Sequence, residues 1–160
     1  ASRLAGKRFS LAGNAGSGGE LLFGRLTYQM MASYWPSPAA LANAPEVARG
    51  MNAVPKVVFS RTLPRAEWQN TRLVKDDLVG AVRQLKAGEG ADLVILGSGT
   101  IIAQLTEARL IDEYRLVVCP VVVGAGRTIF GGNRLGLRLT HSRAFKNGKV
   151  LLHYQPQAAS

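Results

Sequence analysis

The sequence predicts one α/β domain with a mostly parallel mixed sheet, helices on both faces of the sheet and a C-terminal antiparallel hairpin. Short apolar runs alternate with segments whose apolar residues recur at helical spacing. The run from Leu93 to Leu96 is apolar throughout, as expected of a strand that is covered on both faces. Asn147-Gly148, a dipeptide that favours tight hairpin turns, separates the last two extended segments.

The first 19 residues differ in composition from the rest of the chain. They contain five glycines and no acidic residue, so we expect most of this segment to be irregular. A short strand within residues 8–12 is the alternative. A single domain is expected over residues 20–156, and residues 157–160 are expected to form a tail.

Further strands are expected where apolar or alternating runs are bounded by turn residues. They are residues 21–23, 56–59, 71–74, 93–96 and 114–123. Pro120 lies inside the last of these runs, which predicts a bulge or a sheet edge there. The closing hairpin is expected over residues 135–145 and 149–154.

Three helices are indicated by apolar residues at helical spacing. The first begins at Arg25 and ends near Trp35, because two prolines follow. The second is expected after Asp76, a good helix-capping residue, and ends at Gly88. The third has its apolar face at Ile101, Ile102, Leu105 and Ala108. Residues 36–54 are expected to form a loop with one helical turn near residues 45–50.

The chain is basic, with 20 Lys and Arg against 10 Asp and Glu and a net charge of +10. Such an excess can indicate nucleic-acid binding. The basic residues form no long run and do not interleave with aromatic residues, so nucleic acid is the weakest hypothesis for a partner. An anionic cofactor or substrate accounts for the charge better. The chain has no apolar run of the ~20 residues that a membrane span needs.

Metal and nucleophile sites are not indicated by the sequence. His141 and His153 lie on expected strands, and no acidic residue lies between them or anywhere C-terminal to Glu113. Cys119 lies in an apolar run, where a buried and inert thiol is expected. With one cysteine and no secretory signal, we expect a cytoplasmic protein. Asp112-Glu113 is expected to serve a helix end or turn, so no catalytic residue is assigned.

Three turns follow three apolar runs, and their composition favours binding of an anion. They are Gly24-Arg25-Leu26-Thr27, Ser60-Arg61-Thr62 and Gly97-Ser98-Gly99-Thr100. Ligands of open parallel sheets bind outside the carboxyl ends of the strands, where glycine lets the backbone approach a phosphate. Arg25 and Arg61 can each make bidentate contacts with phosphate oxygens. Neither the dinucleotide glycine fingerprint nor the P-loop is complete in this chain.

Five segments together resemble the dihydrofolate reductase-like superfamily. They read LLFGRLTYQMMASYW, VVFSRTL, LVILGSGTIIAQL, LIDEYRLVVCPVVVGAG and FKNGKVLLHYQP. The chain is most similar to the branch that includes the C-terminal reductase domain of bifunctional riboflavin-biosynthesis proteins, and the resemblance covers about residues 20–155. It implies a dihydrofolate reductase-like three-layer sandwich that binds NADPH.

The resemblance also implies the residues that would bind this cofactor, and they fall in the same three turns. Its phosphates would lie against Gly24, Arg25 and Thr27. Its adenosine 2′-phosphate would face Ser60, Arg61 and Thr62. Its pyrophosphate would be held by Gly97, Ser98, Gly99 and Thr100, with Ile101 following toward the nicotinamide.

The function implied is an NADPH-dependent oxidoreductase that transfers hydride to a small pteridine- or aminopyrimidine-like heterocycle. Related folate reductases carry an acid in their first strand and helix, whereas the 19 residues before Glu20 contain none. The alternative is therefore a non-catalytic NADPH- or nucleotide-binding module that has lost its substrate pocket. Members of this branch are commonly dimers, and the apolar residues 117–123 could lie between two subunits.

Overall fold

The computed structural model of the protein describes residues 9–11, 19–88, 92–96 and 99–158. The strands in these ranges are β1 (Phe9–Leu11), β2 (Glu20–Gly24), β3 (Lys56–Phe59), β4 (Thr71–Val74), β5 (Leu93–Ile95), β6 (Glu113–Val118), β7 (Leu137–Ala144) and β8 (Val150–Pro156). The helices are α1 (Arg25–Tyr34), α2 (Pro38–Asn43), α3 (Pro45–Ala53), α4 (Leu78–Ala87) and α5 (Gly99–Glu107).

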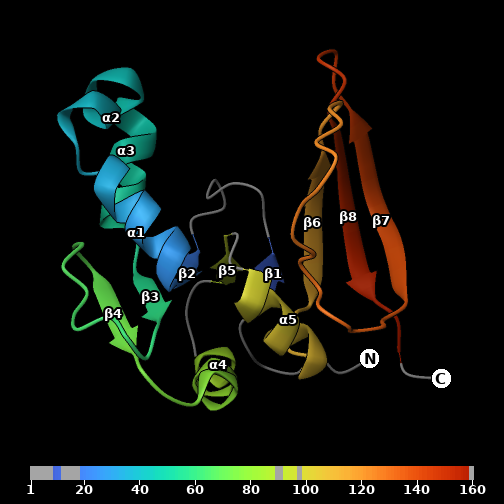
Figure 1. Ribbon diagram of the computed structural model, residues 1–160, viewed down its shortest axis with the longest axis horizontal. Helices are drawn as coiled ribbons and strands as arrows, with labels where there is room; N and C mark the ends of the chain where they lie inside the picture. The colour runs from blue at the N-terminus through green and yellow to red at the C-terminus, as the bar shows by residue number, and fades with distance from the viewer. Residues whose placement is uncertain (1–8, 12–18, 89–91, 97–98, 159–160) are drawn as a thin grey trace.

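The described strands form one sheet in the order β4-β3-β2-β5-β1-β6-β8-β7 (Figure 1). The strands from β4 to β6 run parallel, and β8 and β7 extend the sheet as an antiparallel hairpin. The predicted mixed sheet with its C-terminal hairpin is confirmed. Gly148 has a φ of 89° at the turn between β7 and β8, a backbone conformation that favours glycine.

Strand β1 lies in the segment that we expected to be mostly irregular. It pairs in parallel with β5 on one side and with β6 on the other, so it occupies an interior position in the sheet. The alternative expectation, a short strand within residues 8–12, is therefore confirmed. The sheet begins before residue 20, the expected start of the domain.

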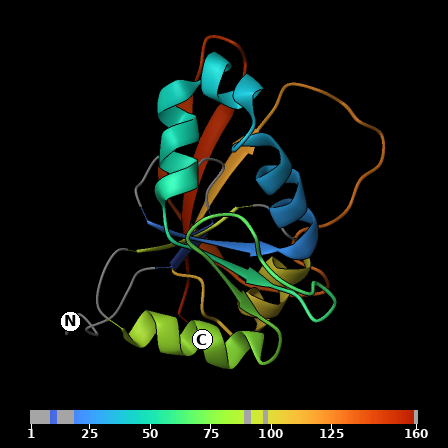
Figure 2. The same ribbon diagram turned by 90° about the vertical axis from the view of Figure 1, so that its left-hand side faces the viewer.

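Each face of the parallel sheet has its own hydrophobic core, because successive residues of a strand point to opposite faces. On one face, Leu22, Val57 and Ile95 pack with residues of α4 and α5. On the other face, Phe23 and Val94 pack with residues of α1 and α3 and with the loop before β4. Figure 2 shows α1 and α3 on one side of the sheet and α4 and α5 on the other. The three-layer architecture is confirmed.

The prediction of a loop over residues 36–54 is wrong for α2, and the single turn expected near residues 45–50 is the longer helix α3. Ser37 caps α2 by accepting a hydrogen bond from the backbone N–H of Ala40 at 3.3 Å, and Pro38 follows as a first helical residue. Pro45 begins α3 in the same way. Proline stops a preceding helix but is well suited to the first turn of the next, where its missing N–H is not needed.

Three further expectations differ from the structure. The cap of α4 is Asp77 rather than Asp76, and its Oδ1 accepts a hydrogen bond from the N–H of Gly80 at 3.0 Å. Strand β6 ends at Val118, two residues before Pro120, so the observed strand is shorter than the one predicted over residues 114–123. Cys119 is consequently exposed instead of buried.

Lys56 is buried in β3 although its side chain ends in an ammonium group, and it is 1% exposed. Its Nζ donates hydrogen bonds to the carbonyl oxygens of Met51, Asn52 and Val54 at 2.8, 3.0 and 2.8 Å. It also lies 4.3 Å from the ring centroid of Trp68. These contacts satisfy carbonyl groups at the end of α3 and attach that helix to the sheet.

A pair of helical glycines predicts opposite effects of the same substitution on stability. Gly50→Ala in α3 should raise the free energy of unfolding by about 0.8 kcal/mol, because an added Cβ meets nothing within 4 Å. Gly80→Ala in α4 should lower it by about 1 kcal/mol, because the new Cβ would collide with the capping carboxylate of Asp77. Urea unfolding of both variants measures the difference, and equal gains would show that the Asp77 cap is not constrained as described.

Candidate functional site

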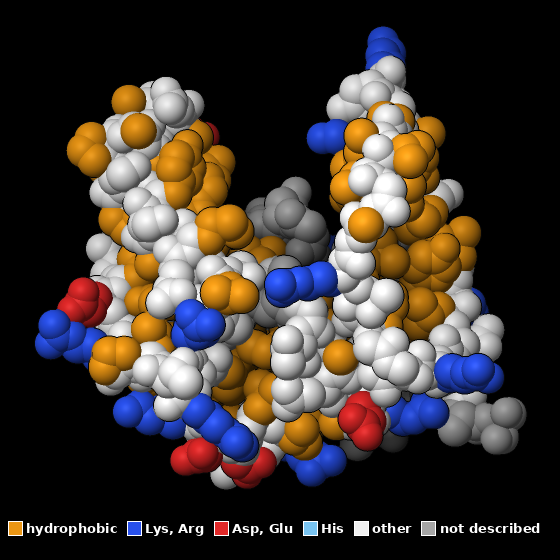
Figure 3. Space-filling model, viewed as in Figure 1, with side chains coloured by type: hydrophobic (Ala, Val, Ile, Leu, Met, Phe, Trp, Pro, Cys, Tyr) orange, Lys and Arg blue, Asp and Glu red, His pale blue; other side chains and the backbone are white. Residues whose placement is uncertain are grey.

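A cleft of about 1060 Å³ lies at the carboxyl ends of the parallel strands, where the sequence predicted a ligand site. Its walls are the turn into α1, the turn after β3, the segment between β4 and α4, the first residues of α5, and residues 127–129. The molecular face in Figure 3 carries more basic than acidic side chains. A volume of this size can accommodate a dinucleotide rather than only a small metabolite.

The cleft brings the three predicted turns together. Eight of the eleven expected residues line it, namely Gly24, Arg25, Thr27, Ser60, Arg61, Gly99, Thr100 and Ile101. Thr62 does not line the cleft, although its Oγ1 lies 3.4 Å from Oγ of Ser60. Gly97 and Ser98 lie outside the described residues. The assignment of these residues to a bound cofactor stays a prediction.

The turn after β3 is held by its own serine. Oγ of Ser60 accepts hydrogen bonds from the backbone N–H groups of Thr62 and Leu63, at 3.2 and 3.0 Å. This serine turn fixes the backbone on both sides of Arg61. The Arg61 side chain is 82% exposed, and its Nε lies 3.8 Å from Oδ1 of Asp76. The turn therefore presents a guanidinium group at one end of the cleft.

Helices α1 and α5 begin at the cleft, and neither has an acidic residue in its first turn. The positive end of each helix dipole is therefore not offset by a local carboxylate, which favours an anion nearby. A Cβ added to Gly99 would lie 3.7 Å from the carbonyl oxygen of Thr128, an ordinary contact distance. Packing within the described protein thus does not demand glycine at this position.

The long segment between β6 and β7 supplies cleft residues that the sequence did not predict. It carries Arg127, Thr128 and Ile129 to the cleft. Asn133 anchors it by donating a hydrogen bond to the carbonyl oxygen of Ala103 at 2.9 Å. Phe130 packs edge-on against Tyr114, with 5.6 Å between ring centroids. The only signal in the sequence was the length of the glycine-rich segment, since long loops without secondary structure are often functional.

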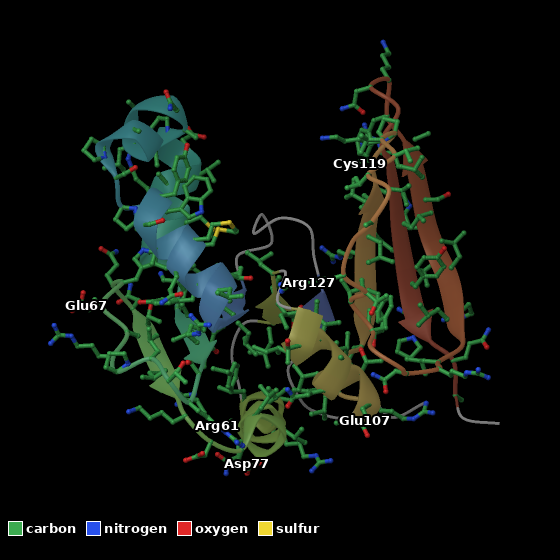
Figure 4. All side chains as sticks on the ribbon, viewed as in Figure 1. Arg61, Glu67, Asp77, Glu107, Cys119 and Arg127 are labelled. Carbon is green, nitrogen blue, oxygen red and sulfur yellow. The ribbon has the colours of Figure 1, made fainter. Side chains whose placement is uncertain are left out.

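The cleft has a basic residue near each end. Figure 4 shows Arg127 beside the start of α5, whereas Arg61 and Asp77 lie at the other end, beside α4. Lys75, Asp76 and Asp77 from the segment before α4 were also missed as cleft residues, apart from the capping role expected of Asp76. The described side chains include no cluster of three histidine, cysteine or acidic residues that could hold a metal ion.

Neither residue of the acidic pair Asp112-Glu113 lines the cleft. Asp112 contacts the last turn of α4, whereas Glu113 is the first residue of β6 rather than part of a helix end or turn. Oδ2 of Asp112 accepts a hydrogen bond from Nζ of Lys86 at 2.7 Å. Glu113 is buried and pairs with Arg115. Within the described parts of the chain, no helix is long and apolar enough to cross a membrane.

The fold and the cleft define a mixed α/β protein with a ligand site at the carboxyl ends of its parallel strands. The chain belongs to the RibD C-terminal domain family, which matches residues 10–151. The resemblance to the riboflavin-biosynthesis branch of the dihydrofolate reductase-like superfamily is confirmed.

The chain is also similar to individual proteins and solved structures. The uncharacterized protein YyaP of Bacillus subtilis is 29% identical over 136 residues, which cover 84% of this chain and 72% of YyaP. A Shewanella sp. PV-4 protein whose name assigns it to riboflavin biosynthesis has a TM-score of 0.66 at 23% identity, covering 87% of this chain and 74% of its own. A pyrimidine reductase-like protein of Corynebacterium diphtheriae has a TM-score of 0.63 at 14% identity, covering 96% and 93%. The two structures establish similarity of fold.

Proposed function

We propose that this protein is an NADPH-dependent reductase that transfers hydride to a small heterocycle of the aminopyrimidine or pteridine class. Membership of the RibD C-terminal domain family supports a pyrimidine reductase-like role. The observation that carries the proposal is the single cleft that gathers three anion-favouring turns at the ends of parallel strands. A dinucleotide with several phosphates requires such a grouping.

The residues of the cleft fit this cofactor. Arg25 and Thr27 would hold phosphate oxygens at the start of α1, and Thr100 would do so at the start of α5. Arg61 would face the 2′-phosphate with a mostly exposed guanidinium group. When bound, NADPH supplies the hydride, and the protein supplies position and electrostatics.

The proton required by the reduction is not assigned to a side chain among the described cleft residues. The carboxylic acids that line the described cleft are Asp76 and Asp77, both in the segment before α4. Figure 4 places Asp77 and Arg61 together, away from Arg127 and the start of α5. We therefore propose that water delivers the proton, while the cleft orients the substrate against the cofactor.

The alternative is a non-catalytic NADPH-binding module. It is favoured because the described cleft residues at the start of α5 include no carboxylic acid. The two functions differ in turnover. The test is to follow the loss of NADPH absorbance with an aminopyrimidine ribose phosphate and with a dihydropteridine. Substrate-dependent oxidation of NADPH supports the reductase, whereas tight NADPH binding without turnover on either substrate supports the binding module.

We also propose that the protein forms a homodimer through the C-terminal sheet, meaning strands β6, β8 and β7 with the segment after β6. Seven large hydrophobic residues are exposed there, namely Val117, Val118, Val121, Val122, Val123, Leu139 and Phe145. Figure 3 shows hydrophobic side chains along this part of the molecule. Exposed apolar patches of this kind in soluble proteins commonly mark interfaces.

The dimer predicts a specific effect of one charge. Val122 is 96% exposed, so Val122→Asp should leave the fold intact and convert a dimer into a monomer in light scattering. Val47→Asp, at a 52% exposed valine of α3, should remain dimeric. A wild-type protein that is monomeric throughout the micromolar range would remove the proposal.

A further inference from the structure

The segment between β4 and α4 places two neighbouring carboxylates in the cleft, and the structure gives them different tasks. Asp77 is engaged in capping α4 through its hydrogen bond with the N–H of Gly80. Asp76 faces Arg61 instead, with 3.8 Å between Oδ1 and Nε. The side chains of Arg61 and Asp76 are 82% and 86% exposed, and both residues line the cleft.

This pairing places a guanidinium group and a carboxylate at one position, and these two groups distinguish NADPH from NADH in different ways. A guanidinium group binds the 2′-phosphate of NADPH through paired charged hydrogen bonds. A carboxylate accepts a hydrogen bond from the ribose 2′-hydroxyl of NADH and repels a 2′-phosphate. A site with arginine alone would favour NADPH strongly, and a site with aspartate alone would favour NADH.

We propose that Asp76 is a specificity-determining residue that reduces the difference between the affinities of the cleft for NADPH and for NADH. The inference rests on the proposed function, in which Arg61 faces the 2′-position of the cofactor. Asp76 competes with the 2′-phosphate for Arg61, and its carboxylate provides an acceptor for the 2′-hydroxyl. Exposed ion pairs are weak, so either ligand group can displace the contact between the two side chains.

The sequence alone does not reveal this role, because it favours Asp76 as the helix cap. The structure assigns the cap to Asp77, which leaves the carboxylate of Asp76 directed toward Arg61. An exposed carboxylate that does not cap the helix contributes little to folding. Substitutions at this position should therefore alter cofactor choice without altering stability.

The test is titration of the full chain with NADPH and with NADH, followed by nicotinamide fluorescence. Asp76→Asn should tighten NADPH binding about threefold, because the competing charge is removed. Asp76→Ala should also weaken NADH binding about threefold, because the acceptor for the 2′-hydroxyl is lost. Glu107→Gln is the matched control, since it makes the same charge change at the far end of α5 (Figure 4) and should leave the NADPH-to-NADH ratio unchanged.

The outcomes separate this inference from the proposed function. If the wild type binds both dinucleotides and the Asp76 variants have the same ratio of NADPH affinity to NADH affinity as the wild type, the proposed role of Asp76 is wrong and the cofactor assignment stands. If Glu107→Gln changes the ratio as much as Asp76→Asn does, the effect is one of net charge and the inference is also overturned. If the wild type binds neither dinucleotide, the proposed cofactor and this inference fail together.

Discussion

Replacing Arg61 by alanine is expected to weaken NADPH binding about tenfold or more, while NADH binding changes less than about threefold. Hydrogen bonds to charged groups contribute about 1.5–3 kcal/mol, and about 1.4 kcal/mol corresponds to a tenfold change in affinity. The 2′-phosphate that distinguishes the two dinucleotides would lose its guanidinium partner. Asp76 would then face the phosphate without an opposing charge, which increases the loss for NADPH.

Arg65 offers a matched control for this variant. Its side chain is 79% exposed and pairs with Glu67 at 2.7 Å, and it does not line the cleft. Arg65→Ala makes the same change in net charge and should leave both affinities nearly unchanged. Equal losses of NADPH and NADH affinity in Arg61→Ala would mean that Arg61 does not contact the 2′-phosphate.

Lys56→Met is expected to lower the free energy of unfolding by about 3 kcal/mol. The substitution removes the donor for three carbonyl groups near the end of α3, at a position that is 1% exposed. Buried acceptors that lose a charged donor are costly, and methionine cannot replace it. Urea unfolding measures the loss. Lys146→Met, at an exposed position of the β7–β8 turn, should change stability by less than about 0.5 kcal/mol.

The cost of Lys56→Met should also depend on pH. Burial lowers the pKa of Lys56 from 10.5 to about 8. Between these values the unfolded chain keeps a proton on Lys56 that the folded protein has released. The contribution of this residue to the free energy of unfolding therefore rises with pH through that window.

The measurement compares the wild type with Lys56→Met by urea unfolding at about pH 7 and about pH 10. The difference in stability between the two proteins should be larger at the higher pH. A difference that shrinks as the pH rises would mean that the three carbonyl groups and the Trp68 ring outweigh desolvation. The pKa of Lys56 would then not be lowered in the folded state.

Several elements could be predicted from local sequence because their signals are local. Strands β2, β3 and β4 are short apolar or alternating runs with a clear turn residue at the end. The helix between Gly24 and Trp35 begins directly after its strand and ends before two prolines. Strand β5 and helix α5 were predicted in the same way, from an apolar run and from apolar residues at helical spacing. In each case one stretch of chain carries the whole pattern.

Other elements depend on information that is not local. Strand β1 has three residues, and its place in the sheet is decided by β5 and β6, which lie far along the chain. Helix α2 was missed, and α3 was expected only as a single turn, because Pro38 was interpreted as a residue that stops a helix. Pro38 and Pro45 in fact each occupy the first turn of a helix, and Ser37 caps α2.

The candidate site divides in the same way. The turns that carry Arg25 and Arg61 could be predicted, because their glycine, serine and threonine residues follow recognisable strands. The position of Arg127 could not, because it depends on the contact of Asn133 with α5 and of Phe130 with Tyr114. The approach of Asp76 to Arg61 depends on which of two adjacent aspartates caps α4, and local sequence does not decide between them.

The most direct test of the account is titration of the purified protein with NADPH and with NADH, followed by nicotinamide fluorescence and thermal stability. We expect micromolar binding of NADPH, about tenfold tighter than that of NADH. At a hundredfold excess over the dissociation constant, NADPH should stabilise the protein by about 2.7 kcal/mol. Absence of binding and of stabilisation with both dinucleotides would contradict the assignment of the cleft to a nicotinamide cofactor.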